Sequence, residues 1–86
     1  MDTTTNTRRG RLLTWLENGT AREIREKAGL SPAKLAERVG GISRVTLYRC
    51  EKERHLPRDR DAAVRYYEAL AQLRDEQEGA GRGSAI

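Results

Sequence analysis

The sequence predicts an all-α fold, a compact bundle of four to five short helices. Apolar residues recur at spacings of three and four along most of the chain, as on one face of an α-helix. Glycines and capping residues separate these stretches, and no convincing alternating pattern predicts a strand. With 86 residues the chain has room for one domain with a small core.

The helix boundaries follow from these separating residues. Ser31 and Ser43 are good caps, and Thr20 and Glu23 have the spacing of a capping box, in which each side chain bonds the other's backbone amide. The expected helices are residues 9–17, 20–28, 31–39, 43 to about 53, and 59 or 61 to 78. We expect disordered tails at residues 1–7 and 79–86, the second rich in glycine, around a domain of residues 8–78.

Several classes of protein are disfavoured by composition. No apolar run approaches the roughly 20 residues that span a bilayer, and the polar N-terminus does not resemble a secretory signal. Cys50 and His55 are the only soft metal ligands, too few for a structural zinc site. We therefore expect a cytoplasmic protein with no cofactor, no metal and no membrane partner, and no group of residues supports an enzyme.

Charge is distributed unevenly along the chain, whose formal net charge is +4. Residues 43–60 hold six basic residues against three acids, whereas residues 61–78 hold five acids against two arginines. A basic segment in the middle of the chain favours an anionic partner such as DNA.

Residues 29–51 are the most informative stretch. They predict two short capped helices joined by a glycine turn, with Ala36 where the helices approach and Ile42 at the corner. The second helix has few large apolar residues, so some of its side chains face outward: Arg44, Val45, Tyr48 and Arg49. Such a helix can lie in the major groove of DNA with its N-terminal side chains on base edges.

Residues from about 21 to 73 resemble the helix-turn-helix family of phage repressors, Cro proteins and related bacterial regulators of the xenobiotic-response-element type. The matching residues are Gly29-Leu30-Ser31, Leu35-Ala36, Gly40, Ser43-Arg44, Thr46-Leu47, Arg49, Glu51 and Pro57. Trp15, residues 20–26 and Arg65-Tyr66 are also similar to small regulators of actinobacteria and their phages. The resemblance implies a transcription regulator that binds double-stranded DNA as a homodimer on an inverted-repeat operator.

The sequence departs from the family pattern at three places. Gly40-Gly41 makes the turn one residue longer, which changes the expected angle between the two helices. Pro32 replaces a glutamine that often grips phosphate, so we expect that contact to be lost. Glu53 replaces a glycine, so we expect the exit from the recognition helix to stay helical.

The candidate base contacts lie on the recognition helix. Arginine pairs with guanine O6 and N7, and a small apolar side chain can pack on a thymine methyl. The candidates are Ser43, Arg44, Val45, Tyr48 and Arg49. The alternative is that the arginines are solvated or touch phosphates, that Val45 packs within the protein, and that Ser43 only caps.

Basic residues outside this face are candidates for phosphate contacts: Lys34, Lys52, Arg54, His55 and Arg58. The alternative reading is a charged loop that serves solubility. Arg38 is a weaker candidate, and Arg8, Arg9 and Arg11 are as consistent with a solvated surface as with a basic arm.

Other residues are assigned structural roles. Arg25 and Glu51 correspond to family positions that form an ion pair between helices. Cys50 occupies a core position and is expected to be buried rather than reactive. The last helix is apolar over more surface than a small core needs, so we expect part of it to form a dimer interface: Tyr66, Tyr67, Leu70 and Leu73. The competing account is that the helix of Trp15 covers these residues.

Two functions remain open from the sequence. The first is sequence-specific DNA binding by a transcription regulator, such as a phage or prophage repressor. The second is an antitoxin or other interaction module that neutralises an unknown partner protein through the acidic last helix.

Overall fold

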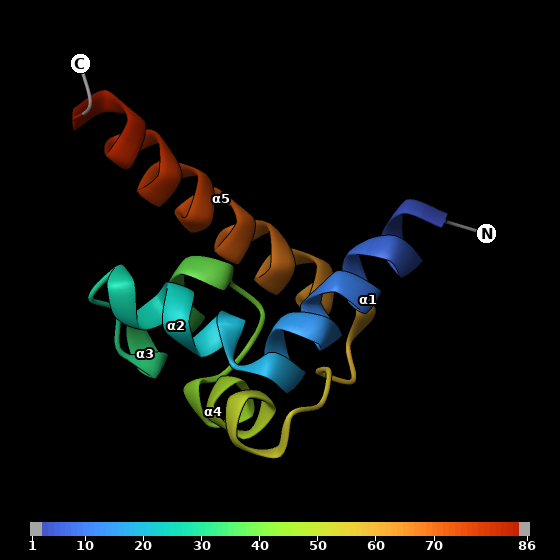
Figure 1. The fold of residues 1–86 in the computed structure, drawn as a ribbon. Coiled ribbons are helices and arrows are strands. Elements are labelled where there is room, and N and C mark those ends of the chain that lie inside the picture. The colour runs from blue at the N-terminus through green and yellow to red at the C-terminus, as the bar shows by residue number, and fades with distance from the viewer. Residues whose placement is uncertain (1–2, 85–86) are drawn as a thin grey trace.

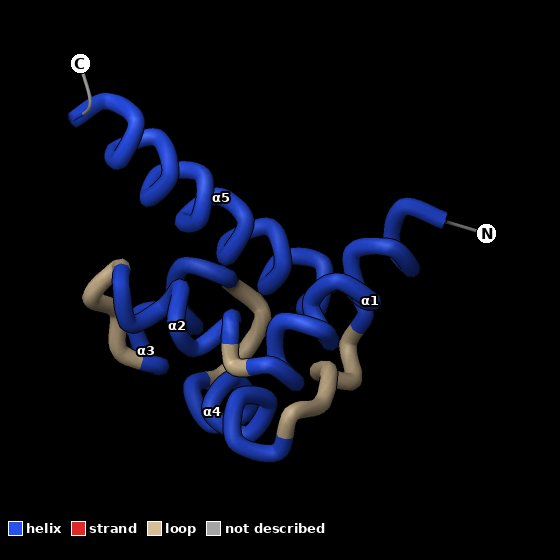
Figure 2. Tube along the Cα trace, in the orientation of Figure 1, coloured by secondary structure: helices blue, strands red, loops and turns tan. Residues whose placement is uncertain are grey.

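The computed structural model describes residues 3–84, which form five helices and no strand (Figures 1 and 2). The predicted all-α bundle is confirmed for this part of the chain. Its helices are α1 (Thr3–Asn18), α2 (Thr20–Lys27), α3 (Pro32–Val39), α4 (Arg44–Glu53) and α5 (Arg60–Ser84). None of the described helices is long and apolar enough to cross a membrane.

Helices α1 and α5 lie side by side, and α2, α3 and α4 gather below them (Figure 1). Leu12 and Leu16 of α1 are buried in the same cluster as Tyr66 and Leu70 of α5. The Trp15 ring of α1 stacks on a tyrosine ring of α5, with centroids 5.1 Å apart. Burial of this apolar surface is the main force that holds the first helix on the domain.

Both long helices extend further toward the chain ends than the sequence predicts. Helix α1 begins at Thr3 and α5 continues to Ser84, beyond the expected helix limits at residues 9 and 78. Once packing has fixed the central turns, adding a residue at an end needs no new nucleus, and this offsets the low helix propensity of threonine and glycine. The remainder of the predicted tails, residues 1, 2, 85 and 86, lies outside the described residues.

The start of α2 corrects the predicted capping box. Gly19 takes the N-cap place in a left-handed conformation, with φ of 85°, and makes the reversal between α1 and α2. The Thr20 amide donates to Oδ1 of Asn18 at 2.9 Å, and the Glu23 carboxylate pairs with Lys27 instead of returning to the cap. The glycine turn moves the cap by one residue, so the threonine and glutamate no longer have the required spacing.

The core lies where α5 crosses the other four helices. Its largest fully covered side chains come from α1, α3, α4 and α5, and α2 adds the buried Ala21 and Ile24. Gln77 of α5 also donates from Nε2 to the Ile24 carbonyl at 3.0 Å. These contacts fix the long helix as a support for the three short ones.

Candidate nucleic-acid interface

Helices α3 and α4 are placed by local signals that the sequence carries. Ser31 caps α3 by accepting from the Lys34 amide at 3.2 Å, and Pro32 occupies the first helical position. Ser43 caps α4 by accepting from the Thr46 amide at 3.1 Å. These two starts agree with the sequence, since each cap satisfies an amide that the helix leaves unpaired.

The turn between these helices depends on its two glycines. Gly40 has φ of 74° and Gly41 has φ of 73°, a region that side chains with a Cβ atom rarely adopt. Two successive residues of this kind bring the chain from the end of α3 to the cap of α4. The longer turn is therefore accommodated by glycine geometry.

Helix α4 has one buried and one open face. Leu47 and Cys50 are completely covered and point into the core. At 100° per residue the opposite face carries Val45, Tyr48 and two basic residues. Val45 is 58% exposed and Tyr48 52%, and they are the two large apolar side chains of the described part of the chain that are exposed.

A buried ion pair holds the inner side of α4 to α2. Nε of Arg25 donates to Oε2 of Glu51 at 2.8 Å, and Nη2 donates to Oε1 at 3.0 Å. The third guanidinium nitrogen donates to the Leu30 carbonyl at 2.8 Å. The side chains are 11% and 6% exposed, and the hydrogen bonds to Glu51 raise the pKa of Arg25. The structure thus pairs the two residues that the family resemblance pairs.

The Cys50 thiol lies beside this pair on the same inner side. Burial, reinforced by the nearby carboxylates of Glu51 and Glu53, raises the pKa of Cys50 to about 11. Because the thiolate is the reactive form, this environment suits a core residue.

The candidate base contacts differ in how free they are. Arg44 is exposed and makes no hydrogen bond or ion pair with the described residues, so its guanidinium is available to a ligand. Arg49 is exposed but lies 3.9 Å from the Glu53 carboxylate. The Ser43 hydroxyl accepts a hydrogen bond from the Thr46 amide and donates one to the Thr46 hydroxyl. Both bonds belong to the helix cap.

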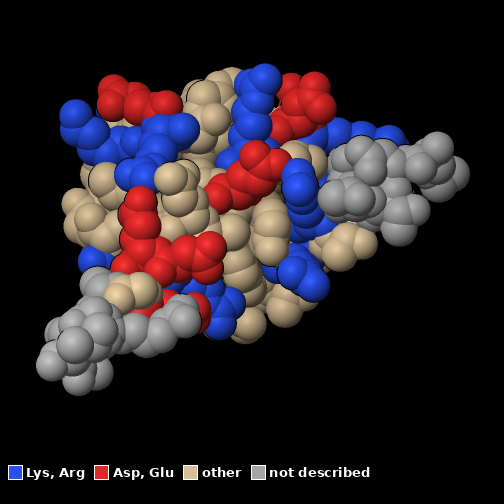
Figure 3. Space-filling model, turned by 90° about the horizontal axis from the view of Figure 1, so that it is seen from above, with Lys and Arg blue, Asp and Glu red and all other residues tan. Residues whose placement is uncertain are grey.

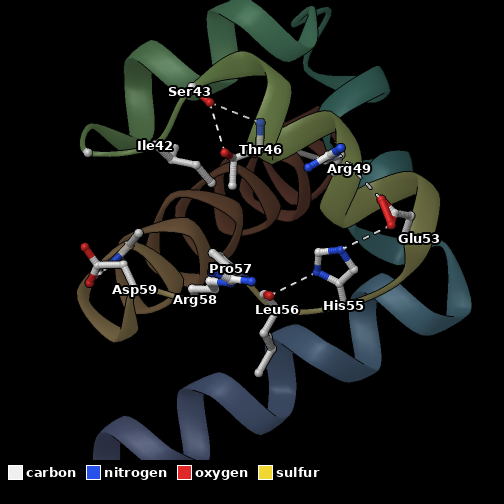
Figure 4. A pocket seen from close by; sticks show the side chains of 12 residues that line it. Ile42, Ser43, Thr46, Arg49, Glu53, His55, Leu56, Pro57, Arg58 and Asp59 are labelled. Atoms are coloured by element: carbon white, nitrogen blue, oxygen red, sulfur yellow. Dashed lines mark hydrogen bonds and ion pairs between the residues drawn. The ribbon is translucent and has the colours of Figure 1, made fainter.

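An open groove of about 750 Å³ borders α4 on one side. Figure 4 shows Ser43, Thr46 and Arg49 on one wall and residues 55–59 on the other. In this wall, Nε2 of His55 lies 3.8 Å from Oε1 of Glu53, and Arg58 of the same segment is exposed. The groove brings two candidate base contacts, Ser43 and Arg49, together with two candidate phosphate contacts, His55 and Arg58.

The remaining phosphate candidates are spread more widely. Lys52 shares the open face of α4, and its Nζ lies 6.0 Å from the centre of the Tyr48 ring. Arg54 ends α4 in a left-handed conformation, with φ of 60°, so Glu53 does stay helical as the sequence predicts. Lys34 lies on α3, 3.8 Å from Glu37.

The four residues predicted at a dimer interface are mostly used by the core. Tyr66 and Leu70 are completely covered and Leu73 is 4% exposed, while Tyr67 is half-buried under Trp15. The exposed apolar patch predicted on the last helix is therefore absent. The competing account is supported at Tyr67, whose ring stacks on Trp15 of α1, and α1 packs along α5.

The acids of α5 are also engaged within the chain. On the face of the molecule that Figure 3 shows, acidic and basic side chains are interspersed. Three of its glutamates pair with arginines: Glu68 with Arg8, Glu76 with Arg38, and Glu78 with Arg74. The acidic segment of the sequence thus does not form a surface of one sign on this face.

Sequence reasoning missed one feature of the interface. Pro32 and Ala33 at the start of α3 line an open depression together with Val45 and Tyr48 of α4. Pro32 stands out in the sequence as a departure from the family, but that departure indicates only a lost phosphate contact. The apolar character of the two α3 residues was the available signal.

Residues 19–77, more than half of the chain, match the model of a protein family described as a helix-turn-helix domain. No curated protein and no solved structure matches the chain. The chain therefore belongs to the helix-turn-helix domain family, whose members bind DNA.

Proposed function

We propose that this helix-turn-helix protein binds double-stranded DNA in a sequence-specific way and regulates transcription, as phage repressors and Cro proteins do. The observation that carries the proposal is the open face of α4. Its inner side is fixed by the core and by the Arg25–Glu51 pair, whereas its outer side presents the exposed side chains of Val45, Tyr48 and Arg44, and Arg44 has no ion pair among the described residues. A rigid helix with such a face fits the major groove.

The outer face divides into base-reading and phosphate-binding parts. Arg44 is the strongest base-reading candidate, because its guanidinium is free and can pair with two acceptors of guanine. Arg49 reads a base after it leaves Glu53. The phosphate contacts come from the end of α4, from the segment that follows it and from α3: Lys52, Arg54, His55, Arg58 and Lys34.

We further propose that two copies bind an inverted repeat. One domain has few base-reading side chains, and two recognition helices about 34 Å apart can read one side of the duplex. Because Tyr66, Leu70 and Leu73 are buried within one chain, the copies pair on the DNA and not through these residues. Sedimentation is then expected to show a monomer in free solution and two copies on the operator.

Neutralisation of a partner protein through α5 has no observation in its favour. Its apolar side chains are covered by α1, and its glutamates are paired within the chain. DNA binding therefore remains the function that the surface supports.

The test is selection of binding sites from random duplexes, followed by measurement of affinity. Arg44→Ala is expected to weaken binding to the selected site by about 1–3 kcal/mol and to relax preference at one base pair, with a smaller loss on random DNA. Arg74→Ala is the matched control, since it removes the same charge from α5, where the guanidinium lies over Trp15. Equal losses for Arg44→Ala on both DNAs would contradict base reading.

Salt dependence tests the electrostatic part separately. If about four to six phosphates are neutralised, log affinity should fall with log salt with a slope of about −4 to −5. A flat response, or selection that yields no preferred sequence, would contradict the proposed function. Repression of a reporter that carries the selected site at its promoter tests the regulatory part.

A further inference from the structure

An open, apolar depression lies between α3 and α4 and is lined in part by Arg44 of α4. Its volume is about 350 Å³, and its lining is almost entirely carbon. The lining comes from two helices: Ser31, Pro32, Ala33, Arg44, Val45 and Tyr48. The start of α3 and the first turns of α4 thus form it together.

The walls of the depression have a fixed shape. Pro32 is held by its ring and by the cap that Ser31 provides. Val45 is β-branched and has one strongly preferred rotamer in a helix. The Ser43 cap and the covered Leu47 and Cys50 fix α4 itself. A small apolar group that packs between Pro32 and Val45 therefore meets walls that are already ordered, which lowers the cost of binding.

The surroundings of the depression indicate what enters it. The aliphatic part of Arg44 belongs to the lining, and Arg49 and Lys52 share the open face of α4. An apolar hollow lined in part by Arg44, on a helix that carries two further cations, fits an apolar group that is carried by a polyanion. In the major groove of DNA, the C5-methyl group of thymine is the apolar group among the base edges.

We propose that the depression receives the C5-methyl group of a thymine in the operator, and that Pro32, Ala33, Val45 and Tyr48 set this preference. The inference rests on the proposed DNA binding and adds a specific chemical requirement to it. It also gives Pro32 a role: where the family often has a phosphate-gripping glutamine, this chain places a wall of an apolar site.

The experiment uses the selected operator and replaces its thymines one at a time by deoxyuridine. This change removes the methyl group and keeps the base pair and its O4 acceptor. At one thymine in each half-site, affinity is expected to fall about three- to fivefold, the effect of exposing one buried methyl group. The other replacements are expected to change affinity by less than about twofold, since they remove no buried group.

Variants of the α3 wall and the α4 wall test whether the depression causes the sensitivity to the thymine methyl group. Val45→Ala and Pro32→Ala are each expected to weaken binding to the thymine operator and to bring the thymine-to-uracil ratio toward one. Arg49→Ala, on the other edge of α4, is the matched control: it should weaken binding to both operators and keep the ratio. Helical circular dichroism before and after heating checks that Val45→Ala folds as the wild type does.

The outcomes separate the inference from the function on which it rests. If the wild type binds its operator specifically and no thymine is sensitive to loss of its methyl group, the inference is wrong and the proposed function stands. If Val45→Ala and Pro32→Ala keep the full ratio, the methyl group is read elsewhere and the inference is wrong. If no sequence is preferred at all, both proposals are wrong.

Discussion

In α5 the large apolar side chains face the core, whereas in α4 two of them face outward. Tyr66 and Leu70 of α5 are completely covered, but Val45 and Tyr48 of α4 are more than half exposed. The sequence predicts the outward face of α4, but it also predicts that part of the apolar surface of α5 forms an interface, because α5 has the longer apolar pattern. Apolar content therefore does not identify a binding surface until the neighbours of each helix are known.

The largest effect is expected from the ion pair that holds the inner side of α4. Glu51→Ala leaves the Arg25 guanidinium buried without its carboxylate, which should lower the free energy of unfolding by about 3–5 kcal/mol. Glu53→Ala is the control on the outer side of the same helix, where the pair with Arg49 is exposed. Its expected effect on stability is within about 0.5 kcal/mol.

Urea unfolding followed by circular dichroism measures both variants. The double variant Arg25→Met with Glu51→Leu removes both charges and should recover much of the loss. Similar stabilities for Glu51→Ala and Glu53→Ala would show that the inner pair does not hold α4.

Leu70→Ala and Val45→Ala test the difference between the covered face of α5 and the exposed face of α4. Leu70→Ala leaves a cavity under α1 and should cost about 2–5 kcal/mol of unfolding free energy. Val45→Ala removes exposed atoms, and its effect should stay within about 0.5 kcal/mol. Thermal melting of the two variants distinguishes a core residue from a surface residue, and equal costs would overturn the assignment of faces.

The Cys50 thiol provides a test of the buried face of α4 at alkaline pH. Its pKa is raised to about 11 in the folded protein, above its value in an unfolded chain. The folded state therefore keeps a proton that the unfolded state loses, so this contribution is present below about pH 8.5 and declines as the pH rises toward 11.

Melting at pH 7 and pH 9.5 should show a larger loss of stability for the wild type than for Cys50→Ala. Alkylation of the folded protein at pH 8 should also be about a hundredfold slower than alkylation of the unfolded chain, because the thiolate fraction falls with the raised pKa. Rapid labelling of the folded protein would place Cys50 outside the core.

The smallest effect is expected at the hydroxyl of Tyr66. This oxygen is buried and has no hydrogen-bond partner among the described residues, and burial raises the pKa of Tyr66. Tyr66→Phe removes an unpaired polar group and keeps the ring, so stability should stay equal or rise by up to about 1–2 kcal/mol. A clear loss in chemical denaturation would show that the hydroxyl has a partner.

Much of the fold and part of the interface were determined by the sequence itself. The serine caps of α3 and α4, the glycine turn between them and the outward face of α4 depend on residues within one or two turns of each other. Such signals act through local hydrogen bonds and backbone conformation, so they can be predicted without knowing what lies nearby.

The tertiary structure decided which apolar surfaces are covered. Whether Leu70 is core or interface depends on α1, which is more than 50 residues away and longer than its pattern predicts. The depression between Pro32 and Val45 likewise exists because two helices meet at one angle, set by a turn with two left-handed glycines. Whether a side chain is buried depends on contacts with residues that are distant in the sequence. A periodic pattern shows that a face is apolar but does not show what covers it.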